Sequence, residues 1–209
     1  VVCGADPACA WDAVEKAWEL TTAAIPSGQT RLGWLPGQRM HDARLEDLHV
    51  VVPQSLLVSA MRNLLENALR YGQVPVQQSG QEPPCSPVFL GLRHVDQLPP
   101  QLRQNDRPPA PAGYVQLVVA DQGPGLSTED CSIAMQRFWR KKHQSHGSGL
   151  GLAIVQRIAQ CSGGGLQLVP LPEWQEAGTV WGLGEERSSG LVVNLYLPVQ
   201  ACRSLDAQA

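Results

Sequence analysis

Two short glycine-bearing stretches of the chain suit different parts of a nucleotide. The stretch from Asp121 to Gly125 offers a carboxylate followed by glycines that let the backbone turn sharply, and the stretch 147–153 is a glycine-rich turn that opens a helix. Glycine lets the backbone approach a ligand closely, and helix N-termini bind phosphate. The second stretch is not a dinucleotide-binding G-x-G-x-x-G, because position 152 is leucine, and it is not a P-loop, because no G-x-x-x-x-G-K-[ST] occurs in the chain. The residues that we expect around the phosphates are Gly147, Ser148, Gly149 and Gly151, with Leu150 and Leu152 anchoring the turn.

A third set of candidate residues lies on one face of an upstream helix. Asn63, Glu66, Asn67 and Arg70 are spaced i, i+3, i+4 and i+7, so their side chains project together. A solvated face is the alternative, but asparagine has poor helix propensity and is an unusual choice there. An amide oxygen that binds a hard cation already holding phosphates explains the two asparagines better. Arg70 would then add charge at the same phosphates, and Tyr71 a flat face for the base.

The carboxylate at Asp121 has two interpretations. Asp-x-Gly is common turn chemistry, so Asp121 could simply close a strand. Its position at a strand end also lets it accept a hydrogen bond from an exocyclic amine such as that of adenine, with Gly123, Gly125 and Leu126 around the base. Considered alone, the two interpretations are evenly matched. The polar helix face and the second glycine stretch favour the adenine contact.

A basic and aromatic run lies between the two glycine stretches. Residues 137–142 read Arg-Phe-Trp-Arg-Lys-Lys, inside a segment of residues 126–146. Such a run is usually a solvated face, and its aromatic residues could be ordinary core. Between two ligand-binding stretches, a lid is the better interpretation, with Phe138 and Trp139 as a hydrophobic latch. Arg140, Lys141 or Lys142 would reach the terminal phosphate, and the sequence does not distinguish them.

Alternating and helical patterns predict the elements that must position these residues. The polar face belongs to a helix from Pro53 to Tyr71 that ends at Gly72, because proline fits a first helical turn and glycine a helix end. The segments 73–87 and 96–113 are expected to be surface loops. The other predicted helices cover 11–24 and 151–161, and the predicted strands cover 31–35, 49–52, 88–95, 114–121, 166–171 and 191–197.

Bulk composition sets limits on the class of protein. The 209 residues are 43% hydrophobic with a net charge of −3, which suits one soluble globular domain and gives no general attraction to nucleic acid. No apolar run reaches the roughly 20 residues that span a bilayer. The six cysteines are scattered without zinc-site spacing, so we expect free thiols in a reducing cytoplasm, although Cys3 and Cys9 could bridge in an oxidising one.

In chain order the motifs resemble the N, G1, F and G2 boxes of sensor histidine kinases. The matching stretches are 63–71, 121–125, 137–140 and 147–155. The resemblance implies an α/β fold, the two-layer sandwich of a mixed β-sheet and helices known as the Bergerat ATP-binding fold and shared with DNA gyrase and heat-shock ATPase chaperones. It also implies one catalytic ATP-binding domain over residues 1–205, with the lid at 126–146 and a tail at 206–209.

The resemblance also assigns roles to individual residues. It implies ATP and Mg²⁺ as cofactors, Asn67 as the metal ligand, and Asn63 helping at the metal and phosphates. Asp121 would hold the adenine amine, Arg70 would contact phosphate, and Tyr71 would pack against the base. Gly147, Gly149 and Gly151 would shape the phosphate end and hinge the lid, with Arg140 and Lys141 as its cations.

Two departures from related proteins predict the reaction. Gyrase and chaperone ATPases carry a water-activating glutamate where this chain has Asn63, and an amide cannot act as a general base. The chain should therefore hold ATP for another acceptor, which Glu66 could orient. Sensor kinases carry their acceptor in a His-Glu-x-x-x-Pro type segment, and none of the five histidines here has that context.

The expected function is therefore transfer of the γ-phosphoryl group to a histidine of a separate dimerisation domain, for relay to a response regulator. We interpret the chain as a cytoplasmic, monomeric fragment of a longer kinase whose parent is an inner-membrane sensor. A serine kinase of the anti-sigma-factor type and a non-catalytic ATP-sensing module are the alternatives. The 96–113 loop could be a partner-specific elaboration or could be inert.

Overall fold

The computed structural model describes residues 7–23, 32–35, 47–72, 87–104, 106–140, 148–176 and 189–200. Five strands form one mixed sheet in the order β2-β4-β5-β7-β6. β2 pairs in parallel with β4, and the remaining neighbours are antiparallel. The strands are β2 (Leu32–Trp34), β4 (Val88–Val95), β5 (Tyr114–Ala120), β6 (Gly165–Pro170) and β7 (Leu191–Pro198).

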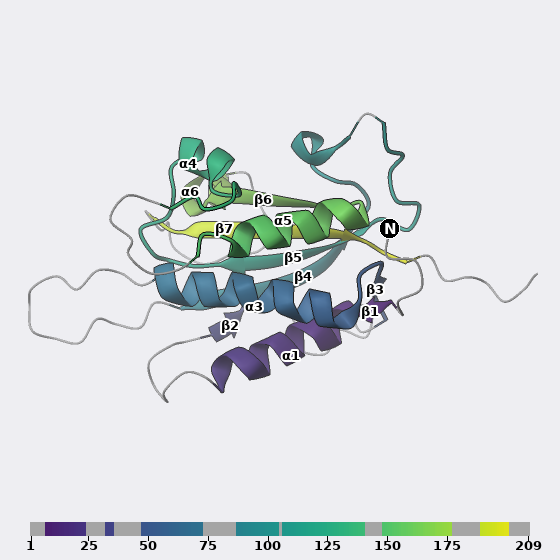
Figure 1. The fold of residues 1–209 in the computed structure, drawn as a ribbon, viewed down its shortest axis with the longest axis horizontal. Helices are drawn as coiled ribbons and strands as arrows, with labels where there is room; N and C mark the ends of the chain where they lie inside the picture. Colours follow the sequence, from purple (N-terminus) through teal and green to yellow (C-terminus); the bar gives the residue numbers. More distant parts are fainter. Residues whose placement is uncertain are drawn as a thin grey trace, which may run out of the picture.

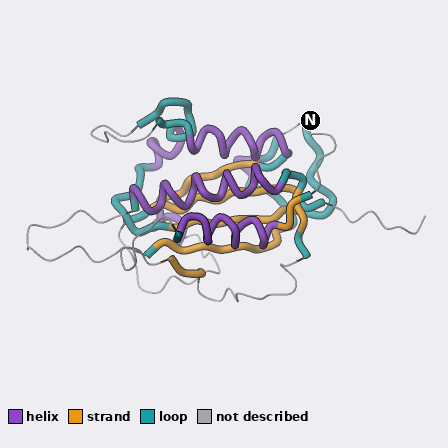
Figure 2. Tube along the Cα trace, turned by 60° about the horizontal axis from the view of Figure 1, so that its bottom comes forward, coloured by secondary structure: helices purple, strands orange, loops and turns teal. Residues whose placement is uncertain are grey.

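Three long helices cover one face of this sheet, as Figures 1 and 2 show. They are α1 (Ala10–Thr22), α3 (Gln54–Tyr71) and α5 (Gly151–Ser162). α3 begins after Pro53, which cannot donate a backbone hydrogen bond, and α5 ends at Gly163 in the left-handed region with φ of 90°. The expected two-layer α/β arrangement is therefore confirmed.

The main core lies between the helices and the sheet because alternate strand residues point towards the helices. In β5 these residues are Val115, Leu117 and Val119, each at most 1% exposed. They belong to one cluster with apolar residues of α3 such as Leu57 and Leu64. No helix in the described part of the chain is long and apolar enough to cross a membrane. Among the cysteines that the structure describes, Cys131 and Cys161 are free thiols.

A stack of three tryptophans joins α1 to the edge strand β2. The indole ring of Trp34 lies 4.9 Å from that of Trp11, with 10° between their planes. On its other side it lies 5.8 Å from the ring of Trp18, with 3° between the planes. Trp11 and Trp18 are seven residues apart and therefore project from the same helix face. This stack fixes the edge strand against the first helix.

The predicted helices and strands are all present where the structure describes them, but four short elements were missed. β3 (His49–Val50) is shorter than the predicted strand 49–52 and pairs with β1 (Ala8–Cys9) in a separate two-stranded sheet. α4 (Thr128–Ile133) lies within the predicted lid, and η1 (Pro100–Leu102) lies within the predicted 96–113 loop. α6 (Leu171–Glu176) occupies part of a predicted loop. Runs of two to six residues are too short to show a periodic pattern.

The 96–113 segment, expected to be a surface loop, is docked on the end of α5. It runs from the end of β4 to the start of β5, at the upper right of Figure 1. The Arg107 guanidinium donates to the carbonyl of Gln160 over 3.3 Å. It also covers Gly163, where a Cβ would lie 3.0 Å from the Arg107 Cζ. A Cβ on Gly165 would lie 2.9 Å from Leu102, so two glycines of the turn 163–165 receive side chains of this segment.

Replacing Gly163 with alanine is expected to destabilise the domain by about 1–2 kcal/mol, because alanine is strained at a φ of 90°. The new methyl group must also displace the Arg107 guanidinium. Urea unfolding measures the effect. Gly33→Ala is the matched control, since its Cβ would meet only the Phe89 ring at 3.5 Å. Equal unfolding midpoints for the two variants would contradict the expectation.

Candidate functional site

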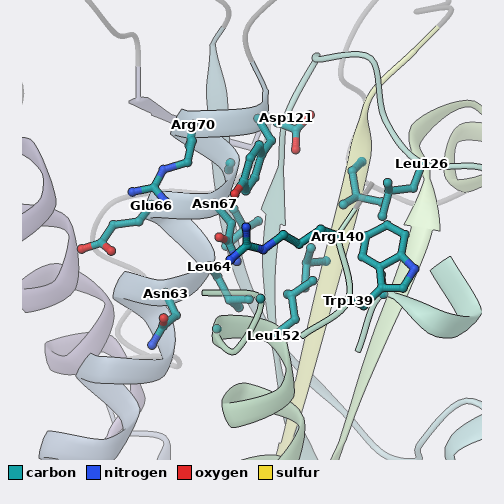
Figure 3. Close-up of a pocket in the computed structure, with 18 of the residues that line it drawn as sticks. Asn63, Leu64, Glu66, Asn67, Arg70, Asp121, Leu126, Trp139, Arg140 and Leu152 are labelled. Carbon is teal, nitrogen blue, oxygen red and sulfur yellow. The ribbon is translucent and has the colours of Figure 1, made fainter. Parts of the chain in front are cut away.

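A cavity of about 250 Å³ lies between the C-terminal half of α3, the start of α5 and the ends of the central strands. Figure 3 shows that its side chains come from both helices and from the segment that follows α4. α3 contributes most of its polar lining, and β5, β7 and α3 itself contribute apolar residues. The apolar lining residues are Leu64, Ala68, Val119, Leu126, Ala134, Trp139, Leu152, Leu191 and Val193.

The two asparagines on the polar face of α3 lie opposite the first residue of α5. A Cβ on Gly151 would lie 3.1 Å from the Asn63 Oδ1 and 3.4 Å from the Asn67 Nδ2. The Asn63 Nδ2 donates to the carbonyl of Ser59 over 3.0 Å, so one end of this amide is fixed on its own helix. Glycine at 151 therefore keeps space open between the asparagine amides and the N-terminus of α5.

The charged residues of this polar face, Glu66 and Arg70, line the same cavity. The Glu66 carboxylate pairs with Arg62 at 3.0 Å, and both side chains are nearly half exposed. An exposed pair of this kind contributes little stability, so Glu66 can exchange it for another partner. Figure 3 shows Glu66 extending from α3 away from Trp139 and Arg140. Arg70 and Tyr71 complete this part of the lining.

Asp121 is the buried carboxylate of the cavity, with only 7% of its surface exposed. It accepts a hydrogen bond from the Gly123 backbone N–H over 2.9 Å. Burial raises the pKa of Asp121 from its ordinary value of 3.8 to about 6, although backbone hydrogen bonds from Gly123 and Leu191 oppose the rise. Asp121 is therefore a buried carboxylate with few hydrogen-bond donors from the protein, and it lies where a donor on a ligand could reach it.

The glycines beside Asp121 allow the strand end to pack against the end of α3. A Cβ on Gly123 would lie 2.5 Å from the Gly72 Cα, and a Cβ on Gly72 would lie 2.6 Å from the Asp121 Cβ. Gly123 was predicted to lie beside the base, but it does not line the cavity. Its role is a close helix contact that fixes Asp121. Gly125, with φ of 63°, does line the cavity.

The two predicted latch residues of the lid behave differently. Trp139 packs against the main core and lines the cavity, whereas Phe138 is 71% exposed. Phe138 has a left-handed backbone with φ of 65°, and its N–H donates to the Gly149 carbonyl over 2.9 Å. A Cβ on Gly149 would lie 2.9 Å from the Phe138 backbone, so the lid and the glycine turn are in direct contact. Trp139 is thus packed as the latch prediction requires, whereas Phe138 is not.

Of the lid cations that the structure describes, Arg140 lines the cavity. In Figure 3 its side chain extends towards α3, while Trp139 points the other way, towards Leu126. The predicted lid segment 126–146 contains α4, where Ser127 accepts the Asp130 N–H as a helix cap. The Thr128 hydroxyl donates to Glu173 of α6 over 2.6 Å and ties α4 to that helix.

Most of the predicted site residues meet at this one cavity. Those that line it are Asn63, Glu66, Asn67, Arg70, Tyr71, Asp121, Gly125, Leu126, Arg140, Ser148, Gly149, Gly151 and Leu152. Gly123 and Leu150 do not line it, and Leu150 caps the N-terminus of α5 instead. Lys141 and Gly147 lie outside the described residues. The lining residues that the sequence missed are mainly apolar, such as Val119 and Val193, which a pattern cannot distinguish from core.

Together the fold and the cavity define an α/β ligand-binding domain with its site between two helices and the ends of the sheet. The family model described as "Histidine kinase-, DNA gyrase B-, and HSP90-like ATPase" matches residues 53–201, well over half of the chain. The chain belongs to this ATPase family. The resemblance found in the sequence motifs is confirmed.

Proteins with similar sequences include a histidine-protein kinase/phosphatase and a sensor protein. The "Signal transduction histidine-protein kinase/phosphatase MprB" of Mycolicibacterium smegmatis is 32% identical over 111 residues, which are 52% of this chain and 18% of the relative. The "Swarming motility regulation sensor protein RssA" of Serratia marcescens is 33% identical over 124 residues, 59% of this chain and 21% of the relative. The chain thus spans about a fifth of the length of these relatives.

Solved structures share the fold. A "Mycobacterial sensor histidine kinase MprB" has a TM-score of 0.61 at 21% identity, with 93% of this chain and 99% of the other chain covered. Full-length ShkA in complex with AMPPNP has a TM-score of 0.60 at 18% identity, covering 96% of this chain and 32% of that one. At these sequence identities, the similarity supports the fold alone. The function must be argued from the residues that line the cavity.

Proposed function

We propose that the domain binds Mg-ATP in the cavity between α3 and α5. Asp121 accepts a hydrogen bond from the adenine amine, and the apolar wall around Val119 and Leu126 covers the faces of the base. The phosphates extend towards the N-terminus of α5, where backbone N–H groups and the helix dipole attract anions. The family membership and the polar and apolar lining of the cavity support this orientation.

The donor set fits a magnesium ion held together with phosphates. The side-chain amides of Asn63 and Asn67 both lie at Gly151 and each carries a neutral oxygen. Mg²⁺ prefers oxygen ligands and keeps phosphates and waters among them. Asn67 is the proposed metal ligand, with Asn63 beside it. Bound Mg²⁺ would supply charge neutralisation at the phosphates. Arg140 and Arg70 add positive charge from the lid and from α3.

The proposed reaction transfers the γ-phosphoryl group to a histidine of a separate dimerisation domain. Asn63 carries the proposal, because its amide cannot take a proton from water and the site therefore preserves ATP for another acceptor. Glu66 extends away from the lid and is paired only with an exposed arginine, so it can turn to orient an incoming imidazole. We propose a response regulator as the next acceptor and a cytoplasmic, monomeric domain within a longer kinase.

A transfer assay tests this reaction. Labelled ATP, magnesium and a dimerisation domain that carries the acceptor histidine should give acid-labile label on histidine, while the domain alone hydrolyses ATP slowly. Glu66→Gln should lower the transfer rate roughly a hundredfold. ATP affinity is measured in parallel and should stay unchanged in this variant.

Rapid hydrolysis by the isolated domain would contradict the argument from Asn63. Arg62→Gln is the matched control, because it removes the exposed partner of Glu66 and leaves the carboxylate in place. Label on a serine of a partner protein would instead identify a serine kinase. A domain that binds ATP and labels neither acceptor would be a sensing module.

A further inference from the structure

A second cavity, of about 310 Å³, lies between the 96–113 segment and the C-terminal end of α5. Leu98, Leu102 and Tyr114 give it apolar surface, and Arg103, Arg107 and Gly163 lie around them. It shares no lining residue with the cavity at the other end of α5. The 12 residues of α5 separate the two sites by about 18 Å.

The walls of this second cavity are fixed by packing and by proline. Leu98 is 8% exposed and forms a cluster with Tyr114 and Tyr196. Pro108 and Pro109 line the cavity, and each fixes its own backbone φ. The Tyr114 hydroxyl accepts the Ala110 N–H over 3.0 Å and holds the two ends of this wall together. The cavity therefore exists before any ligand arrives, which lowers the cost of binding.

Two guanidinium groups are the only charged groups among its lining residues. Arg103 donates to the Leu98 carbonyl over 2.8 Å and to the Gln97 side chain over 2.9 Å. Arg107 donates to the Gln160 carbonyl at the negative end of α5. A guanidinium has five N–H donors, so both keep donors beyond these bonds. Within the described chain neither guanidinium pairs with a carboxylate, and the neighbouring Asp106 does not line the cavity.

We propose that this cavity binds a small organic anion. Its carboxylate or phosphate group pairs with Arg103 and Arg107, whose planar forks match either group. Its apolar body packs on Leu98, Leu102 and Tyr114. In a chain with a net charge of −3, a local pair of arginines without acidic neighbours in the lining selects for such a ligand.

A titration of the domain with phenyl phosphate tests the proposal, because this probe combines an anionic group with an aromatic body. Benzoate replaces the phosphate group with a carboxylate, and phenol lacks the anion. Amide NMR shifts locate each probe, and the titrations are run with and without saturating ADP so that the cavity at α3 does not compete. Saturable shifts of Tyr114, Gly163 and Gly164 are expected with phenyl phosphate or benzoate, and none with phenol.

The double variant Arg103→Gln, Arg107→Gln should weaken binding at least about tenfold, as expected for the loss of charged hydrogen bonds. Arg157→Gln is the control for a general charge effect, because it removes a positive charge from an exposed position on α5 that lines neither cavity. Unchanged spectra with both anions would overturn the proposal. So would equal weakening in the control, or shifts at the α3 cavity alone that ADP abolishes. Circular dichroism confirms that each variant is folded.

Discussion

Replacing Asn67 with alanine is expected to weaken Mg-ATP binding about a hundredfold or more, while the domain stays folded. The Asn67 amide lies with that of Asn63 beside Gly151, and a methyl group cannot replace an amide oxygen as a metal ligand. Alanine has the better helix propensity, so α3 should be as stable or more stable. Isothermal titration with ATP in magnesium and in EDTA measures the effect, and thermal unfolding checks the fold.

Comparing the ATP affinity in magnesium with that in EDTA separates a loss of metal binding from a general loss of nucleotide binding. The variant should lose most of the affinity that magnesium adds and keep the affinity measured in EDTA. Gln101→Ala is the matched control, since it removes an exposed amide from η1, outside the cavity. An Asn67→Ala domain that binds Mg-ATP as tightly as the parent would refute the assigned metal role.

Replacing Asp121 with asparagine is expected to stabilise the nucleotide-free domain and to weaken its binding of adenine nucleotides. Burial makes the ionised carboxylate costly, and asparagine keeps an oxygen for the Gly123 N–H without the charge. The rise of the pKa from 3.8 to about 6 means that the ionised carboxylate lowers the free energy of unfolding by about 3 kcal/mol at neutral pH. The asparagine amide would present donors to the adenine amine, so affinity should fall roughly ten- to a hundredfold.

The pH dependence separates this effect from a general change in packing. The folded pKa of Asp121 is raised, so the folded state binds the proton more tightly than the unfolded chain. In the parent domain, the protonated carboxyl therefore stabilises the folded state below pH 3.8, and this contribution to the free energy of unfolding is lost as the pH rises through about 6. Denaturant unfolding should show the variant's advantage above pH 6 and its disappearance near pH 4.

Asp106→Asn serves as the control, because this exposed carboxylate lines neither cavity. An advantage of the same size at both pH values would mean that the charge of Asp121 is not its cause. Unchanged ADP affinity in Asp121→Asn would refute the adenine contact.

Periodic and directional patterns explain why so much of the site could be predicted. The spacing of Asn63 and Asn67 places both amides on one helix face, wherever that helix lies in the fold. The glycines at 149 and 151 predict that another group packs closely against the backbone there, but they do not identify that group. The structure identifies the partners: the Phe138 backbone at Gly149 and the two amides at Gly151. Side-chain type and local geometry were therefore sufficient for these residues.

The parts that could not be predicted depend on contacts between distant segments. Gly123 fits a turn at the base equally well, and only the position of Gly72 shows that it is needed for packing. The 96–113 segment has the composition of a loop, and its docking depends on glycines some fifty residues later. Phe138 was expected to form a hydrophobic latch with Trp139, but its backbone is left-handed and its side chain is exposed.

The stacked indoles of Trp11, Trp18 and Trp34 make the edge of the sheet visible by spectroscopy. Their rings are nearly parallel and about 5–6 Å apart, so their electronic transitions couple strongly and respond to small changes in separation. Near-ultraviolet circular dichroism reports such fixed aromatic packing. Detachment of β2 from α1 can thus be followed without a label, separately from the far-ultraviolet signal of the three long helices.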